Sequence, residues 1–205
     1  NSMFGGMPSY QITGSTPANK FVGKVKDVLH CGFSDDYECV GILMGYMIGF
    51  FLMLICFGIN PWLSLIGALA LTLSSYFMLI IPAGHITKAN ALGFLGAFFG
   101  GIYAIFHRKY LFGFAIATLA GIVGIASHVQ MSYYFAMLIG ICCLCEVFMH
   151  IKERRWKDLS IAIGTICIVL VFVFGSKLAW WQVNQSYLKE TMRGGHSELT
   201  QADVD

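Results

Sequence analysis

Charged side chains are the scarcest feature of this sequence. Asp, Glu, Lys and Arg make up 12% of the 205 residues and hydrophobic residues 57%, whereas an ordinary soluble domain has about 25% and about 45–50%. So few charges cannot cover the surface of a soluble protein, so the composition excludes a typical soluble enzyme, a disordered chain and a coiled coil. The net charge of +2 is too small to attract DNA or RNA, and no nucleic-acid partner is expected.

The sequence also lacks the motifs of common enzyme and channel sites. It contains no phosphate-binding loop, no HExxH zinc motif, no GxSxG nucleophile elbow and no TVGYG selectivity filter. No internal repeat is visible in it. We therefore expect a protein that is not an enzyme and has no cofactor.

What the chain has instead is a series of long apolar runs. An α-helix needs about 20 apolar residues to cross about 30 Å of hydrocarbon, and lipid offers no partners to backbone groups outside a helix. The sequence therefore predicts an all-α polytopic membrane bundle of six transmembrane helices, at 41–59, 61–81, 89–106, 110–126, 131–151 and 159–178. A five-span alternative treats 41–81 as partly re-entrant.

Short polar breaks separate these runs and predict the orientation of the chain. Asn60 before Pro61 is a helix start, and basic loops follow the third run, at 107–109, and the fifth, at 152–158. Lys and Arg gather in cytoplasmic loops, so we expect both basic loops in the cytoplasm and both termini outside. The membrane would be a bacterial inner membrane or a plasma membrane. Because the chain begins Asn1-Ser2-Met3, either a tag remnant precedes Met3 or a signal peptide was removed before Asn1.

Polar segments flank the apolar region and predict three parts of the chain. Residues 1–40 would form an extracytoplasmic segment, 41–181 the transmembrane domain, and 182–205 a polar, flexible tail. Ser15-Thr16-Pro17 predicts the start of a short amphipathic helix. This helix either lies in the membrane interface or packs on the bundle as a surface helix. Its apolar face would carry Phe21, Val25, Val28 and Leu29.

Two cysteines stand just before the first apolar run. Cys31 and Cys39 enclose a short acidic segment, and in an oxidising compartment they could form a disulfide. They could equally be free thiols or a redox-active pair. The acids between them, Asp35, Asp36 and Glu38, are either a vestibule that attracts cations or a solvated turn.

The fifth run carries one stripe of chemically active side chains. Counting from Cys142, the residues at offsets 3, 4, 7 and 8 share a helix face; they are Cys145, Glu146, Met149 and His150. Glu146 is the only acid inside any predicted span. An acid in hydrocarbon costs a few kcal/mol, so Glu146 should face the bundle interior or snorkel to the interface.

Four interpretations of this stripe remain open. Glu146 and His150 could carry protons or a cation, or Cys142, Cys145, Met149 and His150 could bind a soft metal such as Cu(I) or Zn(II). Cys142 and Cys145 could instead form a redox CxxC pair. The fourth interpretation is a polar helix end, in which Glu146 reaches Arg154 or Arg155.

The pairs Cys31/Cys39 and Cys142/Cys145 resemble the cysteine set of quinone-reducing, disulfide-generating membrane enzymes related to vitamin K epoxide reductase. The resemblance covers these four residues and implies a thiol–disulfide oxidoreductase. In the predicted topology the two pairs lie at opposite faces of the membrane, where they could not exchange electrons directly.

Small residues recur every four positions on three predicted spans. They allow helices to approach closely, within one chain, in a homo-oligomer or with other membrane subunits. The glycines of these faces are Gly41, Gly45, Gly49, Gly96, Gly100, Gly113 and Gly121. We therefore predict a transporter or channel subunit for protons, cations or small solutes, or a packing subunit of a larger membrane complex. The alternative is a membrane thiol–disulfide oxidoreductase that uses Cys142 and Cys145.

Overall fold

The computed structural model describes residues 2–3, 7–8, 24, 28, 38–83, 85–176 and 178. Between residues 38 and 176 the chain is helical, which confirms the predicted all-helical bundle for this part. The helices are α3 (Glu38–Cys56), α4 (Pro61–Thr72), α5 (Ser75–Ile80), α6 (Ile86–Phe106), α7 (Tyr110–Ser127), α8 (Val129–Lys152) and α9 (Trp156–Gly175). Near the N-terminus, β1 (Ser2–Met3) pairs antiparallel with β2 (Met7–Pro8).

Several predictions fall outside the described residues. They concern the amphipathic helix after Ser15, of which only residues 24 and 28 are described, the acids Asp35 and Asp36, the cysteine Cys31, and the tail at 182–205.

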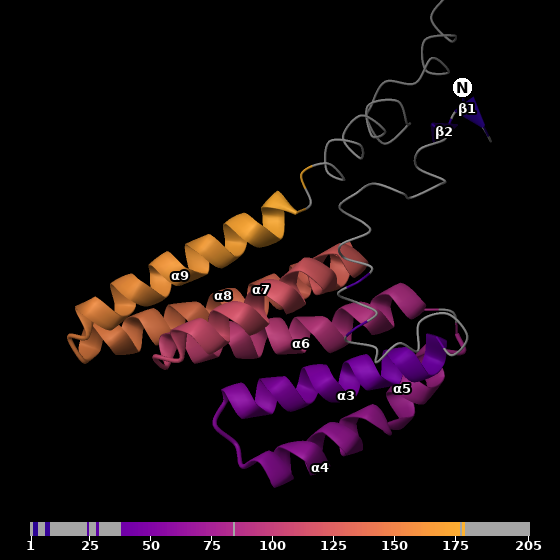
Figure 1. Ribbon diagram of the computed structural model, residues 1–205, viewed down its shortest axis with the longest axis horizontal. Coiled ribbons are helices and arrows are strands. Elements are labelled where there is room, and N and C mark those ends of the chain that lie inside the picture. The colour runs from indigo at the N-terminus through magenta and orange to yellow at the C-terminus, as the bar shows by residue number, and fades with distance from the viewer. Residues whose placement is uncertain are drawn as a thin grey trace, which may run out of the picture.

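The helices form three antiparallel hairpins. Figure 1 shows α3 returning through α4 and α5, α6 returning through α7, and α8 returning through α9. The turns of all three hairpins lie at the left end of the bundle in this view, and the N-terminal end of α3 and the C-terminal end of α9 lie away from them. The two basic loops, at 107–109 and 153–155, are therefore at the same end.

The three hairpin turns share one backbone geometry. Each passes through a residue with left-handed backbone: Gly58 at φ 81°, Arg108 at φ 63° and Arg154 at φ 56°. The backbone amide of the following residue donates a hydrogen bond to the carbonyl five residues earlier. The donor is Ile59 in the first turn (3.1 Å), Lys109 in the second (3.0 Å) and Arg155 in the third (2.9 Å). This is the Schellman ending of a helix, which usually contains glycine. Only the first of these turns has glycine at the left-handed position.

Among the described residues, four helices are long and apolar enough to cross a membrane, so the chain is an integral membrane helix bundle. The four stretches are Cys39–Cys56, Lys88–Phe106, Gln130–Lys152 and Trp156–Gly175. The apolar stretches Pro61–Thr72 and Tyr110–Ile125 are shorter.

The predicted continuous helix at 61–81 is wrong, because the chain breaks between α4 and α5. Thr72 Oγ1 donates to the carbonyl of Ala68 at 2.8 Å, and the amide of Ser74 donates to Leu71, three residues back, at 3.0 Å. Hydroxyl side chains that bond the backbone compete with helical hydrogen bonds, and an i→i+3 bond tightens the last turn.

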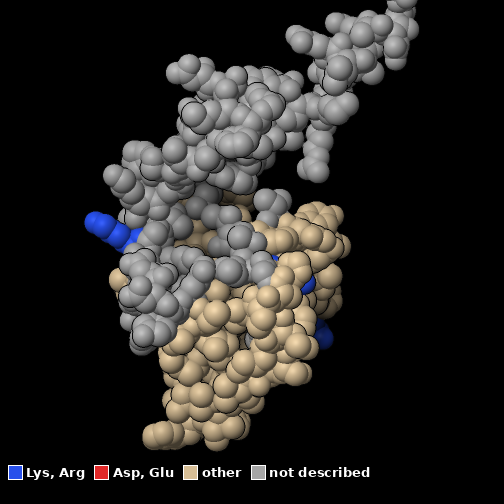
Figure 2. All heavy atoms as spheres, turned by 90° about the vertical axis from the view of Figure 1, so that its right-hand side faces the viewer, with Lys and Arg blue, Asp and Glu red and all other residues tan. Residues whose placement is uncertain are grey.

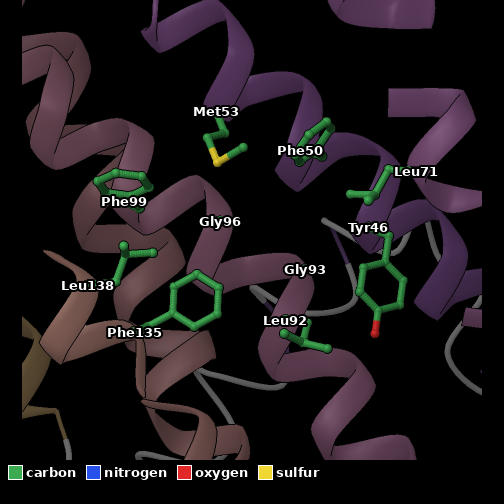
Figure 3. Close-up of a pocket in the computed structure, with 10 residues that line it drawn as sticks. All are labelled: Tyr46, Phe50, Met53, Leu71, Leu92, Gly93, Gly96, Phe99, Phe135 and Leu138. Carbon is green, nitrogen blue, oxygen red and sulfur yellow. The ribbon is translucent and has the colours of Figure 1, made fainter. Parts of the chain in front are cut away.

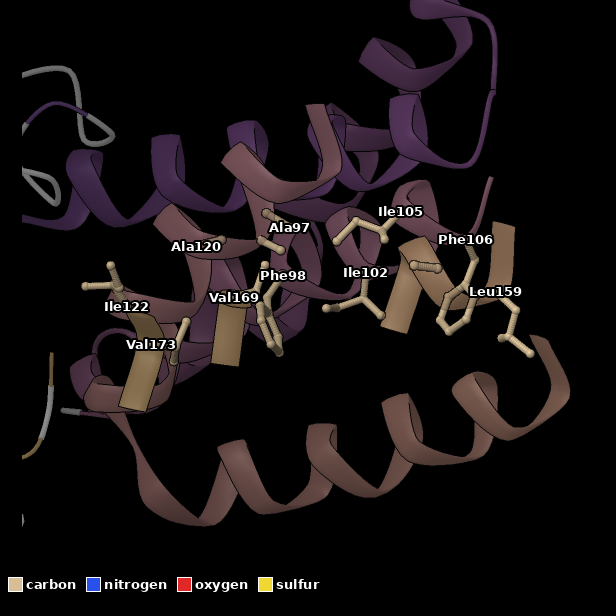
Figure 4. Packing of buried hydrophobic residues seen from close by; sticks show 12 residues of the cluster. Ala97, Phe98, Ile102, Ile105, Phe106, Ala120, Ile122, Leu159, Val169 and Val173 are labelled. Atoms are coloured by element: carbon tan, nitrogen blue, oxygen red, sulfur yellow. The ribbon is translucent and has the colours of Figure 1, made fainter. Parts of the chain in front are cut away.

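Helix α6 lies at the centre of the bundle and contacts α3, α7, α8 and α9. Of its apolar stretch 83% is buried, against 11% of that of α8. Figure 4 shows the main core, where side chains of α6, α7 and α9 meet. A second cluster joins α3, α5 and α6 around Ile42, Tyr46, Ile80 and Ala89.

The small residues of α3, α6 and α7 lie where these helices touch. A Cβ on Gly49 would overlap the carbonyl oxygen of Gly93, and a Cβ on Gly113 would lie 2.6 Å from the carbonyl oxygen of Gly101. Gly100 is equally crowded, because its Cβ would lie 2.7 Å from Cα of Met53. Gly121 meets side chains of α6 and α9, Gly96 has more room, and Gly41 and Gly45 are buried. These faces therefore pack helices of the same chain.

Among the described residues, basic side chains gather at the turn end of the bundle. Figure 2 looks onto the opposite end, where the atoms that are not grey include few charged side chains. The turn end carries both basic loops. Along the sides, α4, α8 and α9 expose large apolar side chains, among them Trp62, Leu144 and Val171. Such surfaces suit contact with lipid.

Candidate functional site

The chemically active stripe of α8 divides between two faces of the helix. The side chains of Glu146 and His150 are only 12% and 4% exposed, and Cys142 is half-buried beside them. Cys145 and Met149 are exposed on the outer side of α8. Of the predicted set, the structure therefore brings Glu146 and His150 together and turns two of the soft ligands away.

Glu146 and His150 form a close buried pair one helical turn apart. His150 Nδ1 lies 3.9 Å from Glu146 Oε2 and 2.8 Å from the backbone carbonyl oxygen of Glu146. A carbonyl can only accept, so Nδ1 carries the proton of this hydrogen bond. Glu146 Oε2 and His150 Nε2 are buried and have no hydrogen-bond partner among the described residues. The pair thus keeps one acceptor oxygen and one ring nitrogen available for a proton or a ligand.

A small cavity between α6 and α8 adjoins the carboxylate. Its lining includes Phe99 and Tyr103 from α6, and Cys142, Cys143 and Glu146 from α8. Its volume is about 10 Å³, at the lower limit of what one water molecule requires.

Tyr103 connects this cavity with the turn end of the bundle. Its ring stacks on that of His107, with centroids 4.0 Å apart, and His107 is exposed. Sequence reasoning missed Tyr103, although an aromatic hydroxyl four residues before a helix-ending histidine is a visible signal.

Ion pairs join the turns of the second and third hairpins. Asp158 accepts hydrogen bonds from Arg108 Nη2 at 2.6 Å and from Arg155 Nε at 3.1 Å. Tyr110 donates to the same carboxylate at 3.4 Å, and Arg155 Nη1 contacts Glu153 at 3.2 Å. The hydrogen bonds to Glu153 and Asp158 raise the pKa of the Arg155 guanidinium.

The predicted bond from Glu146 to Arg154 or Arg155 is not among the described ion pairs. Arg155 is engaged by Glu153 and Asp158 instead. The cause lies in α8: its rotation turns the Glu146 side chain toward α6, away from the loop that carries the arginines.

The described cysteine side chains are poorly arranged for redox or metal chemistry. Cys142 and Cys145 are free thiols, and Cys39 is exposed at the start of α3. Within the described part of the chain, no group of three or more His, Cys, Asp or Glu side chains is placed to hold a metal ion. Cys39 lies at the start of α3, away from the hairpin turns, whereas Cys145 lies in the second half of α8, which ends at a turn. A disulfide between Cys31 and Cys39 stays a prediction.

Comparisons with known proteins find no match to this chain. No protein-family model, no curated protein sequence and no solved structure matches the chain. Its function must therefore be argued from the chemistry of the α6–α8 site.

Proposed function

We propose that this chain is a six-span membrane protein that transports protons, with Glu146 as the exchanging group and His150 as its pH-sensitive neighbour. The observation that carries the proposal is the buried Glu146–His150 pair, in which Glu146 Oε2 and His150 Nε2 lack partners. Taking a carboxylate out of water costs several kcal/mol, and a proton or cation delivered to it removes that cost.

The neighbour makes exchange possible. His150 Nδ1 lies 3.9 Å from the carboxylate oxygen Oε2, and both a carboxylate and an imidazole can bind a proton. A proton can therefore be held by either group, and the exposed His107, stacked on Tyr103, offers a route to the turn end.

The six-span arrangement is part of this proposal. In it α4 and α5 together form the second span and α7 forms the fourth. Three hairpins with their turns at one end support it, since each hairpin then crosses the membrane and returns. Two of these turns are basic, so we place this end in the cytoplasm and both termini on the other side.

Proton flux into reconstituted vesicles tests the transport proposal. The vesicles contain a pH-sensitive dye, and a potassium diffusion potential drives proton entry. Glu146→Gln keeps the shape of the side chain and removes its titration, so the flux should be lost. His150→Asn should move the pH dependence of the flux.

The control is Glu153→Gln, which changes an exposed acid near the end of the same helix and should leave the flux intact. If Glu146→Gln folds and transports protons at the original rate, Glu146 is a helix-end residue and the proposal fails. A chain that conducts nothing and co-purifies with other subunits would instead be a packing subunit.

The alternative is a membrane thiol–disulfide oxidoreductase. It has less support, because Cys142 is half-buried whereas Cys145 is exposed on the outer side of α8. A quinone-reduction assay with Cys145→Ser as control separates the two classes: activity that depends on Cys145 would favour the enzyme.

A further inference from the structure

A larger apolar cavity lies beside the Glu146 site. Its volume is about 340 Å³, and its walls come from α3, α4, α6 and α8. Figure 3 shows Phe50, Phe99 and Phe135 among its walls, with Gly93 and Gly96 on the α6 backbone beside them. Leu138, another wall residue, is 46% exposed, so the cavity opens to the lipid-facing surface.

This cavity and the small cavity at Glu146 follow one another along the contact between α6 and α8, which we call the α6–α8 seam. Phe99 lines both. On α8 the lining passes from Leu138 to Cys142 one turn later and then to Glu146. Helices α6 and α8 run in the same direction (Figure 1). Lining residues later in α6 therefore lie beside lining residues later in α8. Eight residues of helix place Glu146 about 12 Å beyond Leu138.

The seam therefore combines aromatic walls with a single carboxylate at one end. Aromatic ring faces attract cations, most strongly those that are already desolvated. A small hydrated ion gains nothing from apolar walls, and an uncharged lipid gains nothing from Glu146. The complementary ligand has a bulky apolar body and a positive charge.

We propose that the α6–α8 seam binds lipophilic organic cations, with the apolar body in the 340 Å³ cavity and the positive charge at Glu146. This rests on the proposed function, because the cation and the transported proton compete for the same carboxylate. Binding to the protonated site releases one proton: the O–H bond of the carboxylic acid breaks, the proton leaves to water, and the carboxylate pairs with the cation.

Binding should strengthen as the pH rises. The titratable groups around the carboxylate are His150, Cys142 and Cys143 on α8 and Tyr103 on α6. Among the described residues, α7 and α9 contribute none to the cavity lining. Because the cation replaces a proton on the carboxyl group, a lower proton concentration favours its binding.

Equilibrium dialysis of (4-phenylbutyl)trimethylammonium, whose charge lies at one end of an apolar body, against the protein in mild detergent tests this. We expect saturable binding that tightens from acidic to alkaline pH, and no comparable binding of the uncharged 4-phenylbutan-1-ol. Glu146→Gln should lose the pH dependence and most of the affinity. Gly96→Leu should fill the cavity and block binding.

Matched variants separate blocking from misfolding. A Cβ on Gly96 would lie 3.8 Å from Met53 Sδ, an ordinary contact, so Gly96→Ala should fold and show that this position tolerates a side chain. If Gly96→Leu does not fold, Leu138→Trp fills the same cavity from its exposed rim. Gly140→Leu adds the same bulk where nothing lies within 4 Å and should leave binding unchanged.

The outcomes distinguish this inference from the proposed function. If the charged and uncharged probes bind alike, or Glu146→Gln binds the cation as well as the original chain, the cavity holds lipid chains and the inference is overturned. No binding together with proton flux that depends on Glu146 overturns the inference alone. Cation binding that depends on Glu146, without any proton flux, supports the site and removes the transport proposal.

Discussion

Gly49 and Gly140 are both glycines inside helices, yet their surroundings differ completely. A Cβ on Gly49 would overlap the backbone of Gly93, whereas a Cβ on Gly140 would meet nothing within 4 Å. Gly49→Ala must push α3 and α6 apart, which should cost about 1–3 kcal/mol of unfolding free energy. Gly140→Ala should cost nothing. Unfolding of both variants in mixed micelles measures the difference, and equal stabilities would contradict this packing of α3 on α6.

Asp158 accepts hydrogen bonds from both Arg108 and Arg155, and so ties the second hairpin to the third. Asp158→Asn removes the charge and should lower the unfolding midpoint. The loss should shrink at high salt, because screening weakens exposed ion pairs. Glu153→Gln, which affects only the contact with Arg155, should have the smaller effect. A midpoint unchanged at low salt would show that this ion pair does not hold the turns together.

At this scale the sequence identifies the important acid but not its surroundings. Glu146 is recognisable as the only acid inside a predicted span. Whether its side chain faces the bundle interior depends on the rotation of α8 about its axis. Packing against α6 sets this rotation, and the sequence around Glu146 carries no signal of it. Its neighbours Phe99 and Tyr103, more than 40 positions away, could not be predicted for the same reason.

The hairpin turns allow a test at the scale of elements. Left-handed backbone is unstrained for glycine but costs other residues about 1–2 kcal/mol. Arg154 has this backbone and no ion pair among those described, so Arg154→Gly should raise stability by a fraction of that amount. Gly58→Ala, at φ 81° with open space around it, should lower stability by about 1 kcal/mol. Measured unfolding free energies test the predicted gain for Arg154→Gly and the predicted loss for Gly58→Ala. A stabilising Gly58→Ala would contradict this turn geometry.

Most element boundaries follow from local chemistry. The predicted helix start at Pro61 is confirmed, and the Asn60 side chain accepts a hydrogen bond from the amide of Trp62 at 3.0 Å. The breaks at 107–109 and after residue 152 are also confirmed. The break between α4 and α5 was missed because the apolar run 61–81 contains no internal proline or glycine there to announce it.

The arrangement of the whole molecule predicts which loops face each side of the membrane. In a cysteine-free background, Lys88→Cys at the start of the third span should react with an impermeant maleimide on intact cells. Lys157→Cys, at the turn end, should react only after permeabilisation. Labelling of Lys157→Cys from outside would reverse the topology, and labelling of both positions from one side would contradict the six-span arrangement.

The bundle could be predicted from hydropathy, but its internal order could not. Long apolar runs indicate helices in lipid whatever their neighbours. Which helix is central depends on partner faces such as Gly49 with Gly93 and Gly101 with Gly113, and every glycine stripe looks equally suitable in the sequence. The shared hairpin turns were hidden because arginine occupies the left-handed position in two of them.

The central place of α6 has a consequence for biogenesis. Its apolar stretch has a mean hydropathy of 1.6, the lowest of the four candidate spans, against 2.4 for that of α3. When α6 leaves the ribosome, α7, α8 and α9 have not yet been synthesised, so most of the surface they will cover faces lipid or the insertion machinery. Helix α3 is already in place, and the contact of Gly49 with Gly93 can form at once. We therefore expect the first hairpin to retain α6 in the bilayer until the rest of the chain is made.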